Sequence, residues 1–166
     1  MKKLMLLIAA ALAAASCGIY SFSGTSIQPD VNTIAINYFE YTAQKVNPTL
    51  ANDITEALRE QFRKMTRLEQ VETDGDLDIS GEITGYSVSA TAITAQETAA
   101  MNRLTVTVKV DFTNEKHPED NFEGKSFSAY ADFASDVLLD AVEGSLCQEI
   151  IEKINEDIFN ATVAQW

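Results

Sequence analysis

The sequence contains very little histidine and cysteine, and this shortage excludes most catalytic and metal-binding chemistry. Its 166 residues include one histidine, His117, and two cysteines. A Ser–His–Asp triad or a zinc site with several histidines has almost no residues from which to be built. The glycine-rich phosphate loop, the HExxH motif and the Gly-x-Ser-x-Gly elbow are also missing from the sequence. We therefore expect no enzymatic activity and no metal site, and we interpret His117 as a solvated loop residue.

Positively charged residues are scarce as well. The chain has 12 lysine and arginine residues against 25 aspartate and glutamate residues, which gives a formal net charge of −13. Nucleic-acid binding depends on lysine and arginine that displace phosphate counterions, so this balance excludes a nucleic-acid partner. The same surface repels anionic lipid headgroups. Binding of an anionic glycolipid would need a local basic patch or bridging cations.

The sequence lacks a hydrophobic run long enough to cross a membrane. The run from Leu4 to Ala15 has twelve residues, whereas a spanning helix needs about 20. It follows two lysines and ends in alanines and Ser16, which is the layout of a secretory signal peptide. We predict that residues 1–16 are a signal peptide that is removed.

The small residues directly before Cys17 resemble the lipobox of bacterial lipoproteins. This resemblance implies that the chain is cut before Cys17, that its sulfur carries diacylglycerol, and that the new amino group receives an acyl chain such as palmitate. Several acyl chains anchor a protein far more firmly than one. We predict a covalent lipid on Cys17, no other cofactor, and a tether over residues 17–32 that contains Gly18, Gly24 and Pro29. The alternative is ordinary secretion, with Cys17 merely near the cleavage site.

Residues 33–166 have the features of a single domain. Removal of residues 1–16 leaves 150 residues, a length that one hydrophobic core can stabilise without disulfides. No repeat, low-complexity segment or internal linker divides the chain. If Cys17 carries lipid, Cys147 has no disulfide partner within the chain, and we expect Cys147 to be a small buried residue of a helix.

Two segments have the hydrophobic spacing of amphipathic helices. The first begins at Asn47, which can cap the helix, and Pro48, which suits its first position. Its predicted packing face comprises Leu50, Ile54, Leu58, Phe62 and Met65. The second begins at about Ser135 or Asp136, either of which can cap it, and runs to the C-terminus. Its predicted packing face comprises Val142, Leu146, Ile150, Ile154, Ile158 and Thr162.

The remaining segments are rich in strand-forming residues, and several alternate between apolar and polar side chains. The predicted strands are 33–39, 77–85, 103–113 and 126–133. In the last two strands the apolar side comprises Leu104, Val106, Val108, Val110, Phe112, Phe127, Ala129, Ala131 and Phe133. The order of elements predicts an α+β fold: a two-layer sandwich in which two helices pack on one face of a mixed or antiparallel sheet of about four to five strands.

The other face of the predicted sheet is polar, and we expect it to meet water or a polar partner surface. Its side chains on one strand include Thr105, Thr107 and Lys109. Those on the next strand include Ser128, Tyr130 and Asp132.

One basic cluster stands out from the acidic background. Arg59, Arg63 and Arg67, with Lys64 beside them, follow a spacing of four that predicts a stripe along the first helix. The stripe is either a solvated helix face, whose cations suit the C-terminal end of the helix dipole, or a site for phosphate or carboxylate groups, which arginine binds with paired donors.

An acidic segment precedes the second predicted strand. Glu72, Asp74, Asp76 and Asp78 lie close together in it. A solvated turn explains this cluster, and a weak calcium site is the alternative. The twelve-residue loop of an EF-hand is missing.

Six segments, taken in order, resemble the LptE family of lipopolysaccharide-assembly lipoproteins in its divergent form outside the enteric bacteria. They are "CGIYSFSGTSI", "VNPTL", "GEITGYSV", "NRLTVTVKVDFTN", "SFSAYADF" and "EDIFNATVAQW". The resemblance implies a periplasm-facing, lipid-anchored outer-membrane protein that plugs the β-barrel LptD and helps place lipopolysaccharide in the outer leaflet. Cys17 is the functional residue that it transfers to this chain.

A barrel partner gives the polar residues a role. We expect Thr105, Thr107, Lys109 and Tyr130 to face the barrel lumen, and we expect Arg59, Arg63, Lys64 and Arg67 to be the candidate contacts for lipopolysaccharide. Two alternatives stay open. A periplasmic lipoprotein that binds a lipid or small ligand would need an apolar pocket between sheet and helices, and a paired-carboxylate enzyme would need a cleft with perturbed acids.

Overall fold

The computed structural model describes residues 27–45, 47–91 and 100–163. The predicted signal peptide and Cys17 lie outside these ranges. In chain order the elements are β1 (Thr33–Ile36), β2 (Glu40–Tyr41), α2 (Leu50–Met65), β3 (Glu69–Val71), β4 (Leu77–Ala90), β5 (Met101–Asn114), the 3-10 helix η1 (Pro118–Asp120), β6 (Phe122–Ala134) and α3 (Leu139–Val163). Within the described ranges, neither α2 nor α3 has the length and apolar composition needed to cross a bilayer.

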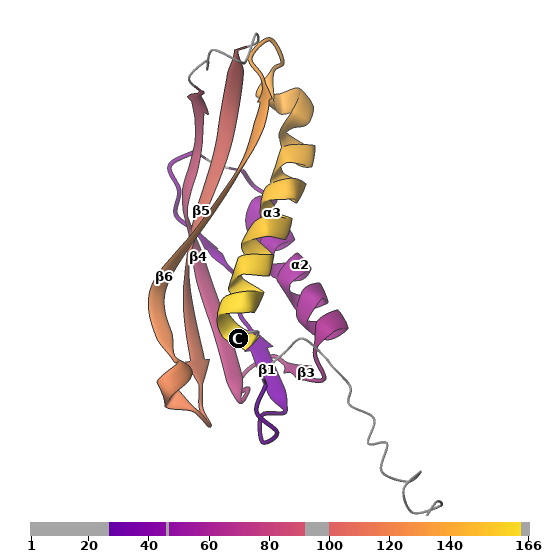
Figure 1. Ribbon diagram of the computed structural model, residues 1–166, viewed down its shortest axis with the longest axis vertical. Coiled ribbons are helices and arrows are strands. Elements are labelled where there is room, and N and C mark those ends of the chain that lie inside the picture. The colour runs from indigo at the N-terminus through magenta and orange to yellow at the C-terminus, as the bar shows by residue number, and fades with distance from the viewer. Residues whose placement is uncertain (1–26, 46, 92–99, 164–166) are drawn as a thin grey trace, which may run out of the picture.

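The sheet has six strands in the order β3-β1-β4-β5-β6, with β2 also paired to β4. β4, β5 and β6 form an antiparallel meander, whereas β1 pairs in parallel with both β3 and β4. Both helices lie on one side of the sheet, with α3 along β6 and α2 near β1 and β3 (Figure 1). The predicted α+β sandwich is confirmed. The sheet is larger than predicted because β2 and β3 have only two and three residues, too few to show alternation.

The alternating pattern of β5 and β6 gives the sheet one buried face. The apolar residues predicted to share this face are all buried: Leu104, Val106, Val108, Val110, Phe112, Phe127, Ala129, Ala131 and Phe133. Since side chains of a strand alternate between faces, the polar residues between them point away from the helices. Ala129 and Ala131 are small, so they leave room for α3 to pack close to β6.

A polar turn and an apolar stripe explain α2. The Oδ1 atom of Asn47 accepts hydrogen bonds from the backbone N–H groups of Thr49 and Leu50, both at 3.2 Å, which closes the turn before the helix. The helix itself starts at Leu50 and its N-cap is Thr49, so the prediction of Asn47 as cap and Pro48 as first helical residue was two residues early. Leu50, Ile54, Leu58 and Phe62 are fully buried. Met65 was wrongly placed on this face, because it is 54% exposed. The helix ends there, the backbone turns to an extended conformation at Thr66, and Leu68 takes the next buried place instead.

The last helix starts later than predicted. It begins at Leu139, so neither Ser135 nor Asp136 is its cap. The N–H of Ser135 still donates to the carbonyl of Ala100 at 3.1 Å, because the chain completes the β5–β6 ladder and then turns before it enters the helix. From Leu146 onward the predicted face is buried: Leu146, Ile150, Ile154, Ile158 and Thr162. Phe62 and Phe159 pack edge to face between the helices, with ring centres 5.0 Å apart.

Candidate functional site

The outer face of β5 and β6 brings together the residues predicted to face a barrel. Thr105 lies directly opposite Tyr130, Thr107 opposite Ser128, and Lys109 opposite Ser126. These pairs form two parallel polar rows on neighbouring strands. Contact with a barrel remains a prediction, but the sheet presents these residues as one continuous polar surface.

Side chains on this surface pair with one another across the strands. Arg103 binds the Asp132 carboxylate through Nε at 2.7 Å and Nη2 at 2.8 Å, and its guanidinium lies 3.6 Å from the centre of the Tyr130 ring. Hydrogen bonding from Arg103 lowers the pKa of Asp132. The hydroxyls of Thr107 and Ser128 are 3.0 Å apart. Because the groups of these two pairs already satisfy one another, this part of the face can meet another polar surface at little desolvation cost.

Two of the four cations of the basic stripe bind backbone carbonyls of the domain itself. Arg59 donates to the carbonyl of Ile36 from Nε at 3.2 Å and from Nη2 at 2.6 Å. Arg67, which follows the end of α2, donates from Nη2 to the carbonyls of Gln28 at 2.8 Å and Val31 at 3.4 Å. Both arginines therefore hold the backbone of the segment around β1.

The other two members of the stripe face solvent. Arg63 and Lys64 both pair with Glu60, and their side chains are 63% and 69% exposed. Of the four cations predicted to bind anions, these two remain accessible to a ligand. Their role in glycolipid binding stays a prediction.

The acidic segment holds the N-terminal part of the domain. The Asp76 carboxylate accepts hydrogen bonds from the backbone N–H groups of Asn32 at 2.8 Å and Thr33 at 3.2 Å. The bond from Asn32 is the largest cause of a lowered Asp76 pKa. Asp78 accepts a bond from Asn37 at 2.9 Å. In the ranges that the structure describes, no group of three or more histidine, cysteine or acidic residues is placed to bind a metal ion.

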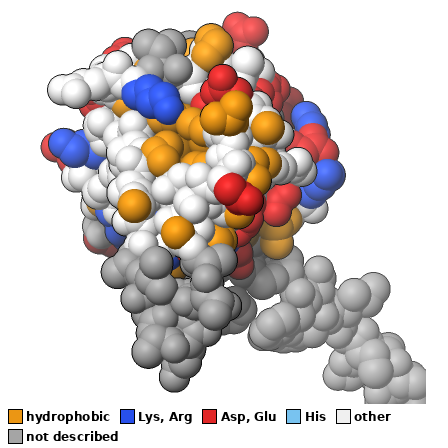
Figure 2. All heavy atoms as spheres, turned by 90° about the horizontal axis from the view of Figure 1, so that it is seen from above, with side chains coloured by type: hydrophobic (Ala, Val, Ile, Leu, Met, Phe, Trp, Pro, Cys, Tyr) orange, Lys and Arg blue, Asp and Glu red, His pale blue; other side chains and the backbone are white. Residues whose placement is uncertain are grey.

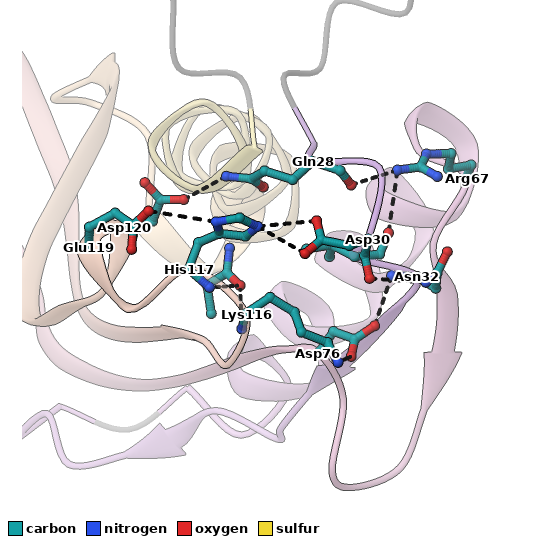
Figure 3. Close-up of polar contacts among 11 residues, drawn as sticks. Gln28, Asp30, Asn32, Arg67, Asp76, Lys116, His117, Glu119 and Asp120 are labelled. Atoms are coloured by element: carbon teal, nitrogen blue, oxygen red, sulfur yellow. Dashed lines mark hydrogen bonds and ion pairs between the residues drawn. The ribbon is translucent and has the colours of Figure 1, made fainter.

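Residues 27–32 are packed against the domain by a polar cluster that we name the tether clasp (Figure 3). It comprises Gln28, Asp30, Asn32, Arg67, Asp76, Lys116, His117, Glu119 and Asp120. Val31, in the middle of the clasped segment, is fully buried. The packed part of the chain therefore begins ahead of the predicted boundary at residue 33.

His117 lies in the loop before η1 and is partly exposed, as predicted, but it is also a member of the clasp rather than a side chain that contacts only solvent. Its Nε2 atom lies 3.1 Å from Oδ1 of Asp30, and this hydrogen bond raises the pKa of His117 and lowers that of Asp30. Gln28 donates to Asp120 at 2.8 Å. Sequence reasoning missed this cluster because His117 and Asp30 are 87 positions apart and no local motif links them.

A groove of about 650 Å³ lies between the N-terminal halves of α2 and α3. Cys147 and Ile151 are among its apolar lining residues, and four carboxylates also line it: Asp53, Glu56, Glu143 and Glu152. Cys147 is buried, as predicted, and its burial raises the pKa of the thiol. The groove lies between the helices, whereas a lipid-binding protein of the kind considered above would need a pocket between sheet and helices. Its carboxylates also repel an anionic lipid.

The end of the molecule remote from the tether clasp carries exposed hydrophobic side chains among polar ones (Figure 2). It is formed by the end of β4, the start of β5 and the connection from β6 to α3 (Figure 1). Viewed from this end, hydrophobic side chains gather on the surface (Figure 2). Leu138 in the connection is 80% exposed, and Val88 on β4 is 39% exposed.

Comparisons with known structures give the same fold. The chain is similar to the hypothetical protein CT253 from Chlamydia trachomatis, with a TM-score of 0.52, 10% identity, and coverage of 80% of this chain and 98% of that chain. It is also similar to protein XCC0632 from Xanthomonas campestris, with a TM-score of 0.50, 7% identity, and coverage of 81% and 88%. At such identities these likenesses show the fold alone. No curated protein matches the chain.

A family comparison goes further. The model of the LptE family, described as lipopolysaccharide-assembly, matches residues 31–162, which is most of the chain and nearly all of the described domain. The resemblance predicted from the six sequence segments is confirmed. Since the role of this family is not enzymatic, the prediction of a non-enzymatic protein is confirmed as well. The chain belongs to the LptE family of lipopolysaccharide-assembly proteins.

Proposed function

We propose that the protein is an outer-membrane lipoprotein that lies in the lumen of the β-barrel LptD and helps place lipopolysaccharide in the outer leaflet. The observation that carries the proposal is the internally paired polar face of β5 and β6, in a chain whose family acts in lipopolysaccharide assembly. A barrel lumen is polar, and a polar sheet face is suited to it.

The size of the domain sets a lower limit on the barrel. A compact domain of about 150 residues has a radius of gyration of roughly 15 Å. Barrels of 16 to 18 strands enclose only a channel, whereas barrels of roughly 22 or more strands have room for a plug. The proposed partner is therefore a very large barrel.

In this proposal the lipid anchor, the tether clasp and the exposed cations of α2 have different tasks. Acyl chains on Cys17 hold the protein at the periplasmic mouth of the barrel, and the tether clasp fixes the point where the chain enters the domain. A tether of this kind raises the local concentration of the plug without a strong interface. Arg63 and Lys64 are the accessible cations for contact with the anionic groups of lipopolysaccharide.

Co-purification tests the proposal. The tagged full-length chain is expressed in its native cell, the outer membrane is solubilised in detergent, and the captured proteins are identified. A photo-crosslinker at Thr107 or Tyr130 marks direct neighbours. We expect one large outer-membrane protein in both measurements. Its absence from both, with the chain folded and abundant, would refute the proposal.

The lipid anchor has its own test. Cys17→Ala should abolish labelling by a radioactive or alkyne-tagged fatty acid and release the protein from the membrane, while the circular dichroism of the domain is unchanged. Fatty-acid label in the mutant would contradict the assignment of Cys17.

A further inference from the structure

The β6 side of the sheet ends in a long unpaired edge. β6 is the last strand in the sheet order, and within the described ranges only β5 pairs with it. It has 13 residues. Exposed edges of this length present a row of backbone donors and acceptors to other polypeptides, and natural proteins usually shorten, cover or pair them.

The backbone groups that face outward can be identified from the register. The carbonyl of Tyr130 accepts a hydrogen bond from Lys153 of α3 at 3.2 Å, so it points away from β5. In an antiparallel pair, residues alternate between those that bond their partner and those whose N–H and C=O groups point outward. Ser128 and Asp132 therefore present their N–H and C=O groups on the same edge as Tyr130.

A groove runs between this edge and α3. It has a volume of about 320 Å³ and is lined by Ser128, Ala129, Tyr130, Lys153, Glu156 and Asp157. The Tyr130 side chain is 48% exposed. The groove thus joins a backbone edge to a charged helix face.

The helix side of the groove is acidic. Lys153 already binds Glu149 at 2.7 Å and the Tyr130 carbonyl. Glu156 and Asp157 are exposed, and no lysine, arginine or histidine within the described ranges forms an ion pair with either. Two exposed carboxylates beside an open strand edge favour an extended segment that brings its own cations.

We propose that the β6 edge receives one extended segment of the barrel partner as an additional strand, and that this segment places lysine or arginine over Glu156 and Asp157. The identity of the partner rests on the function proposed above. Backbone hydrogen bonds to the outward groups of Ser128 and Asp132 and from the N–H of Tyr130, whose carbonyl is already bound by Lys153, supply the pairing, and the acids of α3 select the side chains. A second copy of this chain is disfavoured, because pairing two β6 edges would bring two sets of these acids together.

A proline at the edge tests the backbone pairing. Proline removes an N–H, which an edge strand tolerates where that N–H faces outward. Ser128→Pro should therefore keep the β5 ladder, with circular dichroism like that of the wild type, and should reduce co-purification of the barrel about ten-fold, as expected for the loss of one or two hydrogen bonds. Ser128→Ala removes the same hydroxyl but keeps the N–H, so the recovery of the barrel with this variant is the reference against which the loss of the N–H is measured.

Charge reversal tests the selection of side chains independently of the proline variant, and decides the question if that variant does not fold. Glu156→Lys with Asp157→Lys should reduce recovery of the barrel about three- to ten-fold at low salt. Glu72→Lys with Glu115→Lys changes the net charge equally at exposed sites outside the groove, and should recover the barrel at the wild-type level.

A photo-crosslinker at Glu156 identifies the occupant. We expect a crosslinked peptide of the barrel that contains lysine or arginine. If wild-type protein recovers the barrel but no folded edge variant weakens recovery, or if Glu156 crosslinks to a second copy of the chain, the edge proposal is overturned and the proposed function stands. If wild-type protein recovers no barrel, the proposed function itself fails, and the edge proposal fails with it.

Discussion

The two edges of the sheet differ in length and in how many of the nearby backbone carbonyls are bound by side chains of the α2 region or of α3. The β3 edge is three residues long, and it pairs only with Thr33–Ala35 of β1. Backbone carbonyls before and after these residues bind arginines instead: Arg59 binds Ile36, and Arg67 binds Gln28 and Val31. The β6 edge is 13 residues long, and Lys153 alone reaches one of its carbonyls among the hydrogen bonds of the described residues.

This difference assigns the β3 edge to the stability of the domain and the β6 edge to partner binding. At the β3 edge, arginines that the sequence suggests as ligand contacts are used to close the backbone of the protein itself. At the β6 edge, the backbone stays open beside acids that have no counterion in the described ranges. Substitutions at the first edge should therefore change stability, and substitutions at the second should change partner binding.

The largest effect on stability is expected in the core beside the β3 edge. Ile34 of β1 is fully buried, and Ile34→Ala should lower the free energy of unfolding by about 2–5 kcal/mol because it removes buried methyl groups and leaves a cavity. Chemical denaturation measures this change. A loss below about 0.5 kcal/mol would contradict the burial of β1 on which the comparison depends.

A smaller loss of stability is expected when the arginine that binds the Ile36 carbonyl is removed. Arg59→Met should cost about 1–3 kcal/mol, because the Ile36 carbonyl would lose both of its guanidinium bonds. Arg63→Met is the matched control on the same helix, and should change stability by about 0.5 kcal/mol or less because its ion pair with Glu60 is exposed. Equal losses in both variants would remove the distinction between the two arginines.

The tether clasp should respond to pH. The pKa of His117 is raised from its ordinary value of 6.5 by its bond to Asp30, so its contribution is complete below about pH 6.5 and is lost as pH rises through the raised pKa. The pKa of Asp30 is lowered from 3.8, so its contribution is lost only as pH falls through that lower value. Hydrogen exchange at Val31 and Asn32 should speed up, beyond its intrinsic pH dependence, across the His117 titration.

His117→Gln provides the control for the clasp. It cannot titrate in this range, so exchange at Val31 and Asn32 should follow only the intrinsic pH dependence of amide exchange. An identical additional step in this variant would assign the effect to another group.

The smallest effect on stability is expected at β6. Ser128→Ala removes a hydroxyl that lies 3.0 Å from that of Thr107 and donates to the Val106 carbonyl at 3.1 Å, and should change the free energy of unfolding by about 1 kcal/mol or less. A loss of several kcal/mol on thermal or chemical denaturation would show that the polar face contributes to stability rather than to binding.

Local patterns in the sequence predict most of the fold, because alternation and helical spacing depend on residues close in the chain. The apolar rows of β5 and β6 follow directly from a period of two, and Asn47 closes the turn before α2 through groups two and three residues away. The start of α3 was placed too early, since Ser135 has the chemistry of a cap but is still held by the ladder to Ala100.

The uses of charged residues were harder to predict. A spacing of four puts arginines on one side of a helix, but it does not indicate which backbone lies opposite, so the bonds of Arg59 to β1 were not foreseen. The same limit applies to His117 and Asp30, which only the tertiary fold brings together. The open edge of β6 depends on strand order, and strand order cannot be obtained from periodicity.

The most direct test is a structure of the complex captured from outer membranes with this chain as bait, determined by electron cryo-microscopy. Our account predicts a barrel of roughly 22 or more strands that encloses the domain, with the outer face of β5 and β6 against the lumen wall. A domain bound outside the barrel, or attached to it only through α2 and α3, would contradict the account.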